Sequence, residues 1–185
     1  MNSQPNGSQA PAQQPPHLAL DAERRIEPAS LGDVIQWFLD RDPRVGVVRH
    51  TRVEEVFQWK QRAAREAGEE VFEFARAEDR FAVGVMQALM RNQSEGELHD
   101  WIGQLLNALD DATRTNEEIA RAYRLADGDS SRVAESEKIP TASGREVYLT
   151  CCWLEALCTA EVRVLGWLYQ ELYGRPFHPD NFTRA

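Results

Sequence analysis

Hydrophobic residues occupy most of the circumference of one predicted helix, which spans residues 144–173. At about 100° per residue, its polar positions fall on a single narrow stripe, while the remaining positions are mainly apolar. A helix with this pattern has to be covered by other elements on most sides. The sequence therefore predicts that the C-terminal third of the chain is the buried centre of the fold. The polar stripe consists of Glu155, Thr159, Arg163, Gly166 and Gln170.

Apolar residues at helical spacing also predict a short helix at about 31–41 and a long helix at about 52–91. The short helix is expected to end where Asp42 and Pro43 interrupt the pattern. The apolar phase of the second segment does not reset at Gly68, and no proline interrupts it, so we expect one continuous helix rather than two. At 1.5 Å per residue it would be about 60 Å long.

A further helix is predicted at about 95–127, after a tight turn, and Ser94 with Glu97 resembles a capping box at its start. A short turn between two long helices makes them antiparallel neighbours. A polar loop then allows the helix at 144–173 to return beside them. The sequence thus predicts an all-α, elongated up-and-down helical bundle, with one short and three long helices in a single domain over residues 18–185.

The two ends of the chain differ from this bundle. Residues 1–17 consist mainly of Gln, Pro, Asn, Gly and Ser and have little to bury, so we expect a disordered N-terminal tail. After Gly174, prolines prevent a helix, and Phe177 and Phe182 are expected to fold back as an extended strap.

Composition narrows the class of protein. The chain has 185 residues and a net charge of -9, which argues against general binding to polyanions. Its three cysteines all lie in the helix at 144–173 and are interpreted as small buried residues. Because no signal peptide is evident, we expect a reducing, cytoplasmic location. No apolar run approaches the ~20 residues of a membrane span, so no membrane contact is expected.

Two carboxylates fall on apolar stripes of the predicted helices. Glu161 lies in the apolar arc of residues 144–173, and Glu78 lies on the stripe of residues 52–91. In an up-and-down bundle they fall at about the same height and can face one another. Two carboxylates in a dry core require a proton, a cation or an arginine. A metal or small-ligand site is one interpretation; a polar core layer is favoured, because Glu-x-x-His pairs are absent from the sequence. No cofactor is predicted.

Basic residues gather in two groups, which the predicted helical hairpin would bring together at one end of the bundle. Acidic residues dominate elsewhere, so this end is expected to be positive. An ion-paired surface is the favoured interpretation, followed by a docking site for an acidic protein, a phosphate-bearing ligand or a second copy. Nucleic acid is disfavoured, because no aromatic-interleaved basic run or zinc motif accompanies the arginines. The basic end comprises Arg44, Arg49, Arg52, Lys60, Arg62, Arg65, Arg121 and Arg124.

A second apolar set on the helix at 52–91 lies off its main stripe, toward the polar side. The short helix at 31–41 could cover it, or it could remain as an adaptable, methionine-containing patch for a partner. The set consists of Phe72, Val83, Met86 and Met90.

No catalytic motif is evident, and a solvated side chain is expected for each of the four histidines. We favour a non-enzymatic protein–protein interaction module, such as an adaptor, a regulator or a small subunit, that presents the basic end and the apolar flank. Long helices on a short chain expose much lateral surface, which favours self-association or docking in a larger assembly. The alternatives are a metal- or small-ligand-binding bundle that uses Glu78 and Glu161, and an arginine-based contact to nucleic acid or phosphate.

Overall fold

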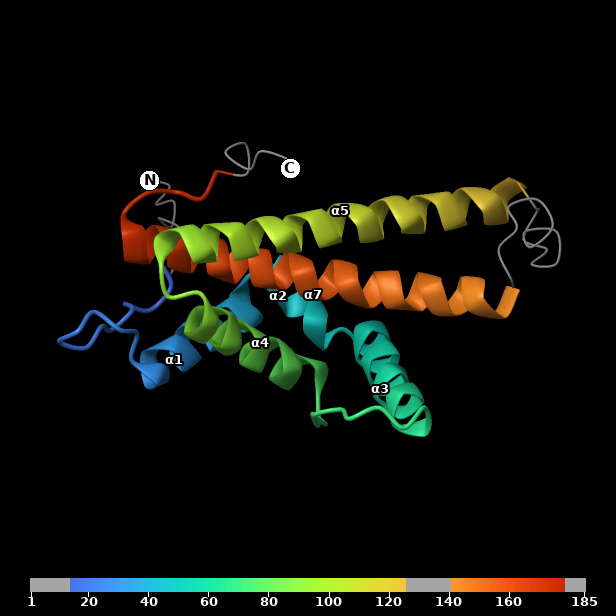
Figure 1. Cartoon of the computed structure of the whole chain (residues 1–185), viewed down its shortest axis with the longest axis horizontal. Coiled ribbons are helices and arrows are strands. Elements are labelled where there is room, and N and C mark those ends of the chain that lie inside the picture. The colour runs from blue at the N-terminus through green and yellow to red at the C-terminus, as the bar shows by residue number, and fades with distance from the viewer. Residues whose placement is uncertain (1–13, 126–140, 179–185) are drawn as a thin grey trace, which may run out of the picture.

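The computed structural model describes residues 14–125 and 141–178, and helices account for most of these residues (Figure 1). The predicted all-α class is confirmed. The expected disordered tail lies outside the described residues up to position 13, as does Phe182 of the expected strap. The elements are α1 (Pro28–Arg41), α2 (Pro43–Gly46), the 3₁₀ helix η1 (Val47–Arg49), α3 (Thr51–Glu66), α4 (Ala77–Arg91), α5 (Glu95–Leu125) and α7 (Thr141–Tyr173).

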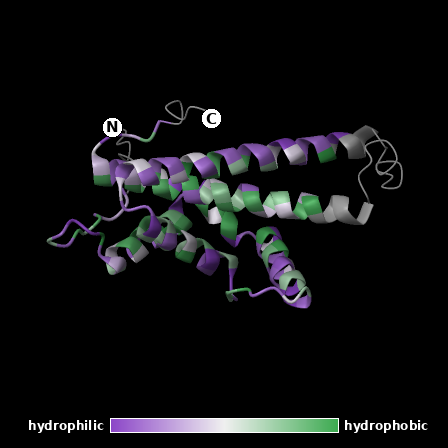
Figure 2. Cartoon of the chain, in the orientation of Figure 1, coloured by the Kyte–Doolittle hydropathy of each residue, from purple (hydrophilic) through white to green (hydrophobic). Residues whose placement is uncertain are grey.

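The α7 helix is the central element, as the hydrophobic pattern predicts. It has 33 residues, and α5, with 31 residues, runs antiparallel along one side of it (Figure 1). Figure 2 shows that α7 is predominantly hydrophobic, whereas α5 carries many hydrophilic residues. Ala160, Val164, Leu165 and Leu168 are each fully buried. No helix within the described ranges is long and apolar enough to cross a membrane.

The N-terminal elements cover another side of α7. The rings of Phe38 in α1 and Trp167 in α7 lie 5.8 Å apart. The guanidinium of Arg163 donates to the Asp42 carboxylate at 2.7 Å, which ties the start of α2 to the polar stripe of α7. Val45 and Val48 are fully buried between these elements.

The predicted single helix at 52–91 is wrong, because α3 ends at Glu66 and α4 begins at Ala77. Residues 67–76, called the linker below, contain no helix or strand. The chain leaves α3 at Gly68, whose φ of +76° is a backbone conformation that glycine adopts readily. The continuous apolar phase was therefore not sufficient to identify one helix.

Polar side chains of α3 hold the linker in place of the missing helical hydrogen bonds. The side chain of Gln61 donates to the carbonyl of Phe74 at 3.0 Å and accepts from its N–H at 2.8 Å. Gln58 donates to the carbonyl of Ala75 at 2.8 Å. The glutamine pair thus binds successive backbone groups of the linker.

The last contact of this series reaches the start of α4. Glu54 accepts from the N–H of Ala77 at 2.7 Å, which satisfies one of the free N–H groups at the α4 N-terminus. From Gln61 back to Glu54, α3 rises by about 10 Å. The three residues of extended chain from Phe74 to Ala77 cover about the same distance. The end of the linker therefore runs antiparallel to α3.

The predicted antiparallel pair between the helices at 52–91 and 95–127 is also wrong. The Ser94 capping box is present, since Glu97 accepts from the Ser94 N–H at 3.0 Å and Ser94 Oγ accepts from the Glu97 N–H at 3.3 Å. However, α5 runs along α7, while α4 diverges from α5 and packs against a different side of α7 (Figure 1). The apolar surface that α7 offers to α5 is wider than the one that α4 offers. The α5 helix therefore pairs with α7 and not with α4.

We expect Gln61→Ala to lower the free energy of unfolding by about 1–2 kcal/mol, because the N–H and carbonyl of Phe74 lose their partners. Gln61 is 8% exposed, so water replaces these bonds only in part. Chemical denaturation followed by circular dichroism measures the change, with Arg62→Ala on the exposed side of α3 as the control. Equal stabilities for the two variants would show that the linker is not held by this side chain.

Candidate functional site

Phe72, on the linker, is the most exposed large hydrophobic side chain in the described ranges. It is 78% exposed, and the neighbouring Val71 is 36% exposed. The ring of Phe72 lies 5.0 Å from the ring of Phe74, whose backbone is held by Gln61. A side chain displayed on a fixed backbone loses little conformational entropy on binding. Phe72 is therefore a pre-positioned hydrophobic contact.

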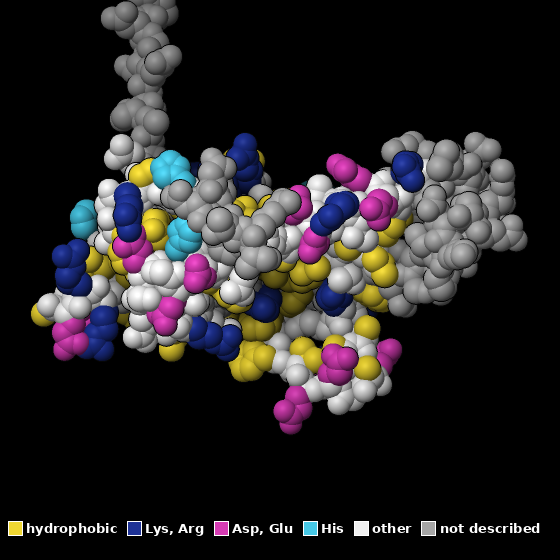
Figure 3. Space-filling model, turned by 45° about the horizontal axis from the view of Figure 1, so that its top comes forward, with side chains coloured by type: hydrophobic (Ala, Val, Ile, Leu, Met, Phe, Trp, Pro, Cys, Tyr) yellow, Lys and Arg dark blue, Asp and Glu magenta, His cyan; other side chains and the backbone are white. Residues whose placement is uncertain are grey.

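Carboxylates surround this phenylalanine. Glu69 and Glu70 precede it and are exposed, and Glu73 pairs with Arg65 at 2.6 Å. Figure 3 shows acidic side chains on the projection that α3 and the linker form at the lower side of the molecule. The site is thus a hydrophobic contact within an acidic rim.

The predicted apolar patch does not form one surface. Phe72 belongs to the linker rather than to a helix, and Val83 is half-buried on α4. Met86 is half-buried beside Ile35 of α1, where the two residues line a small hollow. The short N-terminal helix therefore covers part of the set, which was one of the two alternatives. Met90, at the end of α4, is 73% exposed and is well separated along the helix from the linker.

The predicted basic end is dispersed over several surfaces. α3 packs against α7 through Phe57 and Trp153, whose rings lie 5.1 Å apart, and its C-terminal part projects away from α7 and α5 (Figure 1). Arg49 pairs with Asp40 at 2.5 Å and also with Glu78, so it links α1 to α4. The side chain of Arg124 lies outside the described part. Arg44, Arg52, Arg62 and Arg121 are exposed, Arg65 pairs with Glu73, and Lys60 is half-buried and donates to Thr150 Oγ1 at 3.4 Å.

Glu78 and Glu161 face different sides of α4. Glu78 lies in the first turn of α4, where it pairs with Arg76 at 2.5 Å as well as with the arginine of η1. Glu161 is directed at Arg80 and Gly84. These two positions lie about 200–240° around the helix from Glu78. The structure therefore provides each carboxylate with its own arginine and does not bring the two together.

Glu161 is the more unusual of the two carboxylates, since it is 5% exposed in the centre of α7. A Cβ atom at Gly84 would lie 2.6 Å from Glu161 Oε1, so the absence of a side chain there leaves room for the carboxylate. Burial raises the pKa of Glu161 to about 7, and the nearby charge of Arg80 opposes that increase. Glu161 therefore exists in both protonation states near neutral pH.

The described residues contain no group of three or more His, Cys, Asp or Glu side chains that could hold a metal ion. The three cysteines are free thiols in α7. Burial raises the pKa of the Cys158 thiol to about 11, with a smaller contribution from Glu161, and burial also raises the pKa of Cys151. These two thiols are protonated at neutral pH, which agrees with their interpretation as small buried residues.

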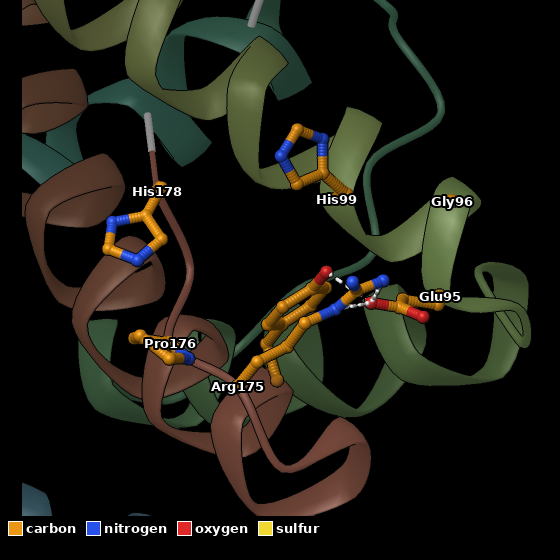
Figure 4. A pocket seen from close by; sticks show the side chains of 7 residues that line it. Glu95, Gly96, His99, Arg175, Pro176 and His178 are labelled. Carbon is orange, nitrogen blue, oxygen red and sulfur yellow. Dashed lines mark hydrogen bonds and ion pairs between the residues drawn. The ribbon is translucent and has the colours of Figure 1, made fainter. Parts of the chain in front are cut away.

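A pocket of about 350 Å³ lies where the start of α5 meets the end of α7 (Figure 4). Tyr169 donates its hydroxyl proton to Glu95 at 2.7 Å, and Arg175 Nε donates to the same carboxylate oxygen at 2.5 Å. The rings of His99 and His178 lie above this group in Figure 4. The lining residues are Glu95, Gly96, His99, Tyr169, Arg175, Pro176 and His178.

The charges in this pocket largely neutralise one another. The hydrogen bond from Tyr169 lowers the pKa of Glu95, and the bond from Arg175 lowers it further. Burial raises the pKa of Tyr169, and its bond to the Glu95 carboxylate adds to the increase. None of the lining residues is a serine, threonine or cysteine. The group joins the ends of two helices and has no hydroxyl or thiol nucleophile apart from the hydrogen-bonded phenol.

Sequence reasoning missed this pocket, because it interpreted His99 and His178 as unrelated, solvated residues. The Ser94 capping box and Gly174, whose φ is +70°, mark the two helix ends that meet here. Pairing those ends required knowing that α5 lies along α7. Phe177 folds back as expected, since its ring lies 4.9 Å from that of His99 and 5.8 Å from that of Tyr169.

Comparison with known proteins finds no matching family model, no matching curated protein and no matching solved structure.

Glu161→Gln should remove a pH dependence of stability. Because the pKa of Glu161 in the folded state, about 7, is above its ordinary value of 4.5, the folded protein retains a proton that the unfolded chain releases. This contribution is fully present below about pH 4.5 and is lost as the pH rises to about 7, with a total of about 3 kcal/mol. Urea denaturation at about pH 5 and about pH 8 measures it. The exposed Glu171→Gln is the control, and an unchanged pH dependence in Glu161→Gln would contradict the assignment.

Glu95→Gln should lower the pKa of Tyr169, since the variant lacks the negative charge that accepts the phenolic proton. Ultraviolet titration of tyrosinate formation, with Tyr169→Phe used to identify this residue among the four tyrosines, measures the shift. Identical titration curves for Glu95→Gln and the parent protein would exclude the hydrogen bond.

Proposed function

We propose that the protein is a non-enzymatic protein–protein interaction module, such as an adaptor, a regulator or a small subunit of a larger assembly, and that Phe72 is its main hydrophobic contact. The observation that carries the proposal is the 78% exposure of Phe72 on a linker whose backbone is bound by α3. Fully burying a phenylalanine gains about 1.5–3 kcal/mol, and aromatic residues are enriched among dominant interface contacts.

The anchoring of the linker supports this proposal. A disordered loop pays an ordering cost each time it binds, whereas Phe74 and Ala75 are already held by Gln61 and Gln58. These hydrogen bonds also explain why Phe72 does not enter the core: the backbone two residues later is bound to the surface of α3.

The surface of α3 beside the linker offers additional contacts. A hollow of about 380 Å³ lies along this helix and is lined by charged and polar side chains. Glu54 and Gln58, which hold the end of the linker, belong to that lining. A partner that covers Phe72 and extends onto this hollow meets the carboxylates of Glu54 and Glu55 as well as the exposed Arg62.

We expect Phe72→Ser to abolish capture of the partner by the full-length protein, because it removes the hydrophobic contact. Affinity capture from an extract of the source cells, quantified by mass spectrometry, compares this variant with the parent and with Met90→Ser. The methionine control removes a side chain of similar exposure, 73%, from a different surface. Light scattering of each purified protein shows whether a second copy is the partner.

The proposal requires a set of proteins, or a dimer, that the parent and Met90→Ser retain and Phe72→Ser loses. Circular dichroism verifies that both variants fold, as expected for such exposed positions. If all three proteins capture the same set and have the same mass in solution, Phe72 is not the contact and the proposal fails.

A further inference from the structure

We infer that the partner of the linker is a cationic protein surface, in which lysine or arginine side chains rim an apolar pocket that receives Phe72. This inference rests on the proposed function and adds the chemistry of the partner. It follows from the negative charge around Phe72, from the carboxylates there that remain available for ion pairs, and from the hydrogen bonds by which α3 fixes the position of these groups.

The chain near Phe72 has a strong excess of carboxylates. Residues 66–79 include six acidic residues and a single arginine, Arg76. Half of these carboxylates already have partners in the protein, since Glu73 pairs with Arg65, and both Glu78 and Asp79 pair with Arg76. The other three are exposed and form no ion pair within 4 Å in the described ranges, although Glu69 also interacts electrostatically with Lys60 of α3: Glu66, Glu69 and Glu70.

The exposed carboxylates of Glu69 and Glu70 lie in one small region with Phe72. The Glu69 N–H donates to the carbonyl of Ala64 at 3.0 Å, which fixes the start of the linker on α3. The hydrogen bonds of Phe74 to Gln61 fix it again just after Phe72. From Glu70 to Phe72 the chain can extend by at most about 7 Å. One partner surface can therefore contact the ring and the carboxylates together.

The same charge disfavours other occupants. Nucleic acid would be repelled by carboxylates that flank the hydrophobic contact. An acidic protein would place like charges opposite one another as water is excluded, which costs several kcal/mol. A cationic rim instead satisfies Glu69 and Glu70 on the outside of the interface, while the ring of Phe72 is buried at its centre. This matches the usual division of an interface into an apolar core and a polar rim.

The division into an apolar core and a charged rim also gives Phe72 a different kinetic role from that of Glu69 and Glu70. Charges at the rim mainly raise the association rate, and the buried contact mainly sets the dissociation rate. Neutralising Glu69 and Glu70 should therefore slow association by about fivefold at low salt and leave dissociation nearly unchanged. Replacing Phe72 should accelerate dissociation instead.

The experiment uses capture by the full-length protein from a nuclease-treated extract of the source cells. It compares the parent, Phe72→Ser, the double variants Glu69→Gln/Glu70→Gln and Glu69→Lys/Glu70→Lys, and the control Glu117→Gln/Glu118→Gln on the exposed side of α5. For proteins whose capture depends on Phe72, the neutralised variant should retain about one fifth at low salt, and the lysine variant almost none. The α5 control should capture them at the parent level. Raising the salt from about 50 to about 300 mM should reduce capture by the parent.

Two outcomes overturn the inference in different ways. Phe72-dependent proteins that are captured equally by the charge variants, or more strongly by the lysine variant, contradict a cationic partner and leave the interaction function intact. If no captured protein depends on Phe72, the proposed function fails and the inference fails with it. Surface plasmon resonance with the captured protein, once purified, then tests the division between association and dissociation rates.

Discussion

The burial of α7 on nearly all of its sides is the constraint on which the other features depend. A helix with apolar side chains around most of its circumference cannot be stable at a surface, so α5, α3, α4 and the N-terminal helices each cover one of its sides. The polar residues of α7 then meet specific partners in these neighbours, such as Asp42 for Arg163 and Asn116 for Glu155. The carboxylate of Glu161 is buried because its position falls within the side that α4 covers.

The helices whose apolar residues recur at helical spacing without interruption could be predicted from the sequence. The break between α3 and α4 could not. The apolar spacing through the linker fits a helix, but Gln61 offers its amide to the backbone of Phe74, and this competition between side chain and helix has no periodic signature. Phe72 and Phe74 also alternate with Glu73, which is equally consistent with an extended segment. Because the break changes the direction of the chain, the helices at 52–91 and 95–127 do not form the expected hairpin.

The same reasoning limits how much of the candidate site was predictable. The burial of Glu161 follows from its position on α7 alone and was correctly predicted. Its neighbours Arg80 and Gly84 depend on how α4 is placed after the linker, which single-helix patterns cannot provide. Phe72 was assigned to an apolar set that either the short N-terminal helix or a partner could cover, and its grouping with Met86 assumed a continuous helix. The pocket beside Glu95 and Tyr169 joins segments that are 74 residues apart and depends entirely on helix pairing.

The contacts of α1 with the far end of the chain have a consequence for biosynthesis. Phe38 and Asp42 find their partners at Trp167 and Arg163, which a ribosome adds more than a hundred residues later. Until that point the first helices have no central helix to cover, and their apolar faces remain accessible to chaperones and to other nascent chains. The complete core can therefore form only after α7 has been synthesised, and a chain that ends before α7 would lack the helix around which this core packs.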